Sequence, residues 1–219
     1  GFEKVSLNLY KLSAYLPVCK AMLDLGPEWL DKYVRTVLAE SMYIALEQAV
    51  IAGTGKDQPI GMIKDLAGAV VDGVYPDKEA TAITDLDPAT LGAEIMAPLT
   101  NGGKRSVSNV IMIVNPLDYW SKVFPAITTR NASGEYVQST AIPIRFIEST
   151  EVTVGTAVCG MAKDYFLGVG NTQKIQYSDE VRFIEDERVY INKQYANGRP
   201  KANDSFLVFD ISGIGVPTP

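Results

Sequence analysis

The feature that most constrains the fold is the segment from Pro27 to Ala52, which contains no glycine or proline after its first residue. Its apolar residues recur at three- and four-residue spacing, as one side of an α-helix requires. Pro27 suits a first helical position, and Gly53 suits the end of a helix. The sequence therefore predicts a helix over 27–52, roughly 39 Å long at 1.5 Å per residue, whose apolar side packs on a sheet.

Shorter segments around this helix indicate mixed secondary structure. Residues 5–12 alternate apolar and polar side chains, which predicts a strand with one buried face. Residues 88–100 and a segment that begins at Pro116 are typical of helices, and the apolar run 110–114 predicts a strand that is buried on both faces. Helices and strands therefore alternate in the middle of the chain.

The last third of the chain has a different composition. Residues 181–195 and 205–211 are rich in β-branched and aromatic side chains. They are separated by residues 196–204, with the sequence ANGRPKAND, which is a strong turn signal. We expect these two segments to pair as antiparallel strands.

The composition argues against several classes of function. Histidine is absent, which removes the usual general base of serine and cysteine hydrolases and the commonest metal ligand. The two cysteines lack the spacing of a zinc site or a disulfide framework. A net charge of −6 argues against a broad contact with phosphate backbones, and no apolar run approaches the roughly 20 residues of a membrane span. We predict no cofactor, no metal site, no specific nucleic-acid binding and no membrane contact.

The loop at residues 53–62, GTGKDQPIGM, is superficially like a phosphate-binding loop. A Walker loop needs a glycine five residues before its Gly-Lys pair and a serine or threonine after the lysine, but Val50 and Asp57 occupy these positions. The loop also follows the long helix, whereas phosphate loops precede a helix. These residues favour a structural turn.

The order of the elements resembles that of the major capsid proteins of tailed phages, which have the Hong Kong 97-type fold. The segment KLSAYLPVCKAMLDLGPEWLDKYVRTVLAESMYIALEQAVIAGTGKDQPIGM is similar to that family's strand, connector, long spine helix and Gly-rich loop. SNVIMIVNPLDYW, RNASGEYVQSTAIPIRFIEST and the strands of residues 162–211 extend the likeness over nearly the whole chain. The resemblance implies an α+β fold with two domains. In the peripheral domain, residues 1–79 and 171–219, the spine helix (about 27–52) packs on an antiparallel sheet, and residues 80–170 form a mixed α/β axial domain.

The resemblance also implies a function. The chain would be a structural head protein that self-assembles into the icosahedral shell of a tailed phage or prophage, located in the virion and assembled in the host bacterial cytoplasm. Its partners would be copies of itself in pentamers and hexamers, together with a scaffolding segment or protease and a portal. No catalytic residue is implied.

Candidate subunit contacts are the exposed side of the spine helix and two groups of residues near the end of the chain. The two groups are Glu185, Asp186, Glu187 and Arg188, and Asn197, Gly198 and Arg199. A solvated turn is an equally good interpretation of the charged residues 185–188.

Two other functions are considered. An encapsulin nanocompartment shares this architecture and encloses an enzyme instead of a genome, and the residues separate it poorly from a phage protein. An enzyme that uses carboxylates such as Asp118, Glu135 or Asp164, with Lys163 close in sequence, belongs to a different class. Charged residues beside turns are usually solvated, however, and nothing in the sequence brings these four together.

Members of the resembling family carry an N-terminal arm and a long extended loop before the strand that begins here near Phe2. Both are absent from this sequence. In that family these parts reach across neighbouring subunits, so we expect that this chain folds but does not close into shells by itself.

We predict that the chain does not bind ATP, because the 53–62 loop lacks the spacing that holds phosphates. Calorimetric titration of the chain with ATP and Mg²⁺ should give no binding heat, for the wild type and for Lys56→Ala alike. Micromolar binding that Lys56→Ala abolishes would contradict this interpretation of the loop.

Overall fold

The computed structural model describes residues 9–23, 26–138, 140, 142–170 and 175–215. Its most prominent element is the helix α2 (Pro27–Ala52), which has the bounds that the sequence predicts. Gly26 precedes it with proline at the first helical position, and the Gly53 amide donates to the Ala49 carbonyl at its end. A short helix, α1 (Lys20–Leu23), leads into it.

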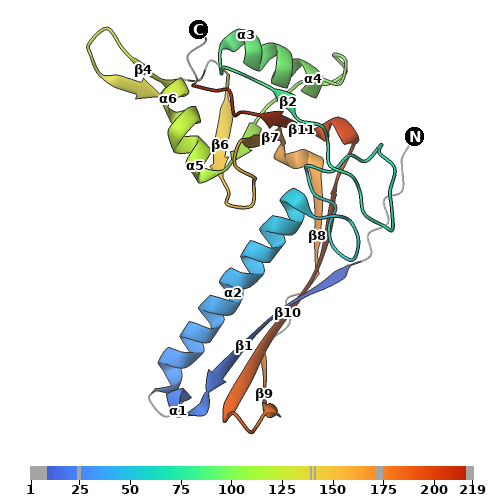
Figure 1. Ribbon diagram of the computed structural model, residues 1–219, viewed down its shortest axis with the longest axis vertical. Helices are drawn as coiled ribbons and strands as arrows, with labels where there is room; N and C mark the ends of the chain where they lie inside the picture. The colour runs from blue at the N-terminus through green and yellow to red at the C-terminus, as the bar shows by residue number, and fades with distance from the viewer. Residues whose placement is uncertain (1–8, 24–25, 139, 141, 171–174, 216–219) are drawn as a thin grey trace.

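A four-stranded sheet runs beside α2 and forms the long lower half of the molecule (Figure 1). Its central strand pairs on one side with β1 over ten residue pairs, and on the other with β8 at one end and β9 at the other; all of these pairs are antiparallel. The strands are β1 (Tyr10–Cys19), β8 (Tyr165–Val169), β9 (Gln176–Arg182) and the central β10 (Glu187–Pro200).

The helix α2 covers one face of this sheet. Leu30, Val34 and Leu38 lie on one side of the helix, because they are spaced four residues apart, and all three are buried with Val18 of β1. Along β1, residues 10–16 alternate between half-buried and exposed side chains. The predicted packing of a spine helix on an antiparallel sheet is therefore confirmed.

A five-stranded sheet forms the core of the upper half, in the order β2, β11, β7, β3, β6. The strand β3 is buried along its whole length, as its sequence predicts, and β6 is parallel to it while β7 is antiparallel. The strands are β2 (Thr81–Ala82), β3 (Val110–Val114), β6 (Ile144–Glu148), β7 (Thr156–Met161) and β11 (Phe206–Asp210).

Two helical segments and a small hairpin accompany this sheet (Figure 1). Both segments contain a widened π-type turn, and both begin at a proline that the sequence analysis places at a helix start. The first consists of α3 (Pro88–Thr90), η1 (Leu91–Met96) and α4 (Ala97–Leu99), and the second of α5 (Pro116–Asp118), η2 (Tyr119–Val123) and α6 (Phe124–Ile127). The hairpin pairs β4 (Thr128–Arg130) with β5 (Tyr136–Gln138).

The expected pairing of residues 181–195 with 205–211 is wrong. β10 pairs with β1, β8 and β9, whereas β11 lies in the other sheet between β7 and β2. The cause is that residues 196–200 are not a turn but the last part of β10, where they pair with β8. Tertiary pairing thus overrides the turn propensity of Asn, Gly and Pro in this segment.

Other expectations lie partly outside the described residues. Of the predicted strand 5–12, residues 5–8 are not described, and β1 continues to Cys19, well beyond the predicted end. The domain bounds 1–79 with 171–219 and 80–170 stay a prediction. β11 lies within residues 171–219, yet it shares its sheet with β3, β6 and β7, which lie within residues 80–170.

The 53–62 loop is a packed turn. The Gly61 amide donates to the Gly53 carbonyl, and a side chain at Gly53 would meet the carbonyl oxygens of Ala49 and Pro59 at 2.3 Å. The Ile60 amide donates to the Gly198 carbonyl at 2.8 Å, which ties the loop to β10. The amides of Gly61 and Ile60 are therefore engaged within the subunit.

We expect Leu38→Asp to lower the free energy of unfolding by at least about 3 kcal/mol, because it places an unpaired charge in a dry contact. Leu38 is only 1% exposed and packs between α2 and the sheet. The neighbouring Ala39 is exposed on the same helix, so Ala39→Asp is the control and should cost less than about 1 kcal/mol. Urea unfolding measures both, and equal losses would show that the buried side of α2 is wrongly assigned.

Candidate subunit interface

The lower end of the molecule is the tip of the β9–β10 hairpin, where residues 183–186 connect the two strands (Figure 1). The Asp186 amide donates to the Phe183 carbonyl at 3.2 Å and closes the turn. Asp186 has a φ of 53°, a conformation that aspartate tolerates better than most residues. The turn is therefore closed by a backbone hydrogen bond. We call residues 181–186 the tip.

Ion pairs within the hairpin hold the tip in place. Arg188 makes a two-pronged contact with Asp179, at 2.6 and 2.9 Å, and its guanidinium lies 4.5 Å from the centre of the Tyr177 ring. Hydrogen bonding to Arg188 lowers the pKa of Asp179 and raises the pKa of Arg188 above its usual range. A paired guanidinium of this geometry restricts the hairpin more than a single point charge would.

Lys20 connects the tip to the rest of the subunit. Its backbone amide donates to the Asp186 carbonyl at 3.0 Å, and its Nζ lies 3.6 Å from the Asp186 carboxylate. The same Nζ lies 5.4 Å from the centre of the Phe183 ring. Since Lys20 follows β1 directly, these contacts attach the turn to the end of the sheet.

The tip exposes large apolar side chains. Val181 and Phe183 are each 72% exposed, and Ile184 is 95% exposed. Several large apolar side chains exposed in one hairpin are typical of a protein contact surface. The sequence pattern pointed to the charged residues beside them and not to these three. The available signal was the concentration of apolar residues, Val181, Phe183 and Ile184, beside the charged residues 185–188.

The seven predicted contact residues lie at opposite ends of β10. Glu185 and Asp186 are exposed in the tip, while Glu187 and Arg188 are half-buried in ion pairs with Arg182 and Asp179. The remaining three residues, Asn197, Gly198 and Arg199, are in the part of β10 that pairs with β8.

Asn197 and Gly198 are buried inside the subunit, and only Arg199 is half-exposed. A side chain at position 198 would meet the ring of Tyr165 at 2.6 Å, so glycine is needed for this close approach. The Tyr165 hydroxyl in turn donates to the Ile60 carbonyl at 2.9 Å. This burial argues against a direct contact of Asn197 and Gly198 with a neighbouring subunit.

Two further surfaces expose aromatic side chains. On α2, Trp29 and Tyr33 are exposed and stack in parallel with their ring centres 5.5 Å apart. In the upper half, Leu117 and Trp120 are exposed on the second helical segment, and the Trp120 indole donates to Glu148 of β6. β6 is the edge strand of its sheet among the described residues. On α2, the rings of Trp29 and Tyr33 make the exposed side of the spine helix partly apolar, as a contact surface would be.

The carboxylates considered for catalysis do not converge. Asp118 is buried, pairs with Lys122 at 2.7 Å and accepts from the Gly155 amide. Asp164 is buried and pairs with Arg105 at 2.6 Å. Each one therefore stabilises local structure at a different place.

The remaining two residues of that set are in the solvent. Glu135 lies in the turn of the β4–β5 hairpin beside Asn131, and Lys163 is exposed in the turn before β8. Across the part of the chain that the structure describes, no three side chains of His, Cys, Asp or Glu are grouped as metal ligands. None of the described helices has the length and apolar composition to cross a membrane.

Solved structures with a similar fold include a capsid and an encapsulin complex. The capsid of an empty GTA particle superposes with a TM-score of 0.60 at 12% identity, over 96% of this chain and 79% of the other. The Mycobacterium phage Che8 structure gives 0.60 at 14% identity, over 95% and 75%. An encapsulin complex from Synechococcus elongatus PCC 7942 gives 0.56 at 13% identity, over 96% and 77%.

These identities are low and show the fold alone, which is the α+β fold that the sequence analysis expects. No curated protein matches the chain in sequence. The family is shown by a different comparison, in which the model of the phage capsid family matches residues 1–211. The chain therefore belongs to the phage capsid family and is a structural shell protein.

Proposed function

We propose that this chain builds the closed icosahedral head of a tailed phage or prophage, and that the hairpin tip is one of the contacts between its subunits. The exposed apolar side chains of the tip carry this proposal. Ile184 is almost completely exposed, although transferring such a side chain out of water is worth about 1.5–3 kcal/mol. A rigid element that places Phe183 and Ile184 in solvent is best explained by a neighbouring subunit that covers them.

Pentamers and hexamers are the rings from which the shell is built, according to this proposal. A ring needs head-to-tail contacts between two different surfaces of one subunit. The upper half offers Leu117 and Trp120 beside the edge strand β6, on one side of the five-stranded sheet. The GTA capsid structure was computed with C5 symmetry, which is compatible with five-fold rings in that particle.

The remaining parts of the proposal concern partners and chemistry. A scaffolding segment or protease and a portal would be the partners of assembly, and the host bacterial cytoplasm its location. We propose no enzymatic activity, because the carboxylates that could supply it, Asp118 and Asp164, are engaged in buried ion pairs. The net charge of −6 supports a shell that encloses nucleic acid without binding it specifically.

We expect Ile184→Glu to weaken self-association of the chain by at least about tenfold in Kd, because it removes apolar contact area and adds a charge to the interface. The wild type should form small oligomers as its concentration rises. Sedimentation velocity over a concentration series measures this shift.

Val154→Glu is the matched control, because Val154 is an exposed apolar residue, 53% accessible, in a turn of the upper half. It should associate like the wild type. The proposal is wrong if Ile184→Glu and the wild type associate equally, or if the wild type stays monomeric at millimolar concentration.

A further inference from the structure

The two sheets of the subunit are joined by two neighbouring turns. One is η3 (Ala162–Asp164), between β7 and β8, and the other consists of residues 201–205 with η4 (Asn203–Ser205), between β10 and β11. The Lys201 amide donates to the Asp164 carbonyl at 2.8 Å, so the two turns are bonded to each other. We call this pair of turns the junction. Any change in the angle between the sheets must bend the chain here.

A third segment crosses the same place. Residues 63–80, which we call the strap, lead from the loop after α2 to β2 in the five-stranded sheet. The Lys78 amide donates to the Ile63 carbonyl, and the Asp65 amide donates to the Pro76 carbonyl, so the two arms of the strap are bonded to each other. The strap therefore touches both halves of the subunit without belonging to the strands of the long sheet.

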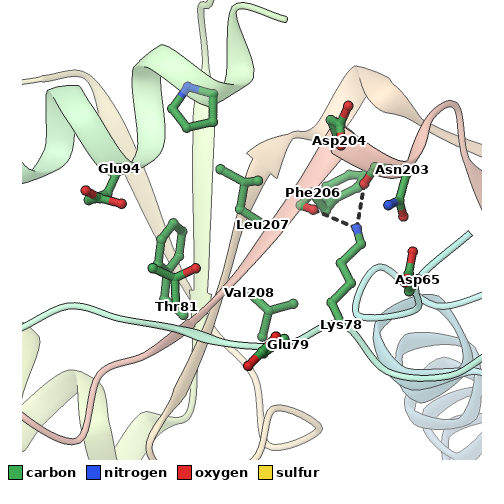
Figure 2. Close-up of a pocket in the computed structure, with 12 residues that line it drawn as sticks. Asp65, Lys78, Glu79, Thr81, Glu94, Asn203, Asp204, Phe206, Leu207 and Val208 are labelled. Atoms are coloured by element: carbon green, nitrogen blue, oxygen red, sulfur yellow. Dashed lines mark hydrogen bonds between the residues drawn. The ribbon is translucent and has the colours of Figure 1, made fainter. Parts of the chain in front are cut away.

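Lys78 fastens the strap to the junction. Its Nζ donates to the carbonyl oxygens of Asn203 and Phe206, both at 2.7 Å, as Figure 2 shows. The Met62 carbonyl accepts a longer hydrogen bond from the same Nζ, at 3.5 Å. An ammonium group has three donors, so these acceptors match its capacity. The contacts join the loop after α2, the strap, η4 and the start of β11 through one side chain.

Asn203 connects to the strap a second time. Its side-chain oxygen accepts from the Leu66 amide at 2.9 Å, while its carbonyl accepts from Lys78. Removal of Lys78 would leave the Phe206 carbonyl without this donor, at the residue where β11 begins. Charge-assisted bonds to carbonyls are stronger than neutral ones. Of the two connections between the strap and Asn203, the one made by Lys78 is therefore stronger than the one made by the Leu66 amide.

The side chain lies beside a cavity of about 320 Å³ that is rich in carboxylates (Figure 2). Carboxylates line the two cavities beside Lys78: Asp65, Glu79, Glu94 and Asp204 line one, and Asp77 and Glu151 line the other. Lys64, the other lysine of the strap, is buried and pairs with Asp77. The surroundings of Lys78 are therefore partly dry and negatively charged.

Burial lowers the pKa of Lys78 to about 8, although the charges of Asp204 and Asp65 act in the opposite direction. A lysine in the unfolded chain has a pKa near 10.4. Between these two values the folded chain binds fewer protons than the unfolded chain, so stability from this group rises as the pH increases from 8 to 10. Below pH 8 the Lys78 side chain is charged in both the folded and the unfolded chain. The free-energy cost of burying that charge is then fully present.

We propose that Lys78 is a positioning residue that fixes the angle between the two sheets by clamping the strap to the junction. The inference goes beyond shell formation, because it concerns the isolated subunit. Copies of a shell subunit occupy slightly different surroundings, so the angle between their two sheets must be well defined. A single side chain with three backbone acceptors can define that angle.

Spin labels at the two ends of the subunit test the proposal. Cys19 is exposed at the lower end of the long sheet, Cys159 is fully buried, and Ser133 is exposed in the β4–β5 hairpin. With labels at Cys19 and Ser133→Cys, we expect one narrow distance distribution for the wild type at pH 7. Lys78→Met should broaden it by at least about twofold, since the strap then loses its charged connection to the junction.

Two variants make this test specific. Lys78→Arg keeps a charged donor and should restore the narrow distribution, whereas Lys201→Met removes an exposed lysine at the same junction and should leave it unchanged. Circular dichroism and the protection of Cys159 from thiol reagents establish that each variant is folded. If Lys78→Met does not fold, Lys78→Gln replaces it, with the same expectation. A distribution as narrow as that of the wild type in the uncharged variant overturns the proposal.

A pH series gives the second readout. The difference in urea midpoint between the wild type and Lys78→Arg should shift in favour of the wild type between pH 8 and pH 10, because arginine stays charged in both states. A difference that is constant over this range would place the Lys78 ammonium in solvent and would contradict the clamp.

Discussion

The structure depends on one strand, β10, each of whose 14 residues pairs with at least one neighbouring strand. β1 pairs with it from Glu187 to Ala196, and β8 and β9 share its other edge. Its first residues carry the tip, and its last residue leads into the junction. The strand therefore connects, in one straight element, the contact surface at one end with the five-stranded sheet at the other (Figure 1).

This arrangement suits a subunit in which the contact surface at one end must keep a fixed position relative to the sheet at the other end. The helix α2 stiffens the sheet, because Leu30, Val34 and Leu38 bury the same face that β1 and β10 present. The tip is held by the Arg188–Asp179 pair, and so its apolar side chains are offered in a fixed position. At the other end, backbone acceptors converge on Lys78 and join three segments that are distant in sequence. A tip and a junction held at fixed positions along β10 suit the repeated contacts of a shell.

The sequence predicts the local features of this fold well and its long-range pairings poorly. α2 and β3 are identified correctly, because an uninterrupted helical period and a fully apolar run have few alternative structures. The partner of β11 is assigned wrongly, since strand pairing is decided by tertiary contacts. Residues 196–200 have the composition of a turn, yet their pairing with β8 makes them strand. Lys78 has no sequence signal, because its three acceptors are backbone carbonyls.

The most direct measurement of the central claim is an electron microscopy reconstruction of the particle that contains this chain. The account predicts that Phe183 and Ile184 are buried against a neighbouring subunit, with the Arg188–Asp179 pair intact beneath them. A reconstruction in which the tips of the hairpins project into solvent and touch no other subunit would contradict it.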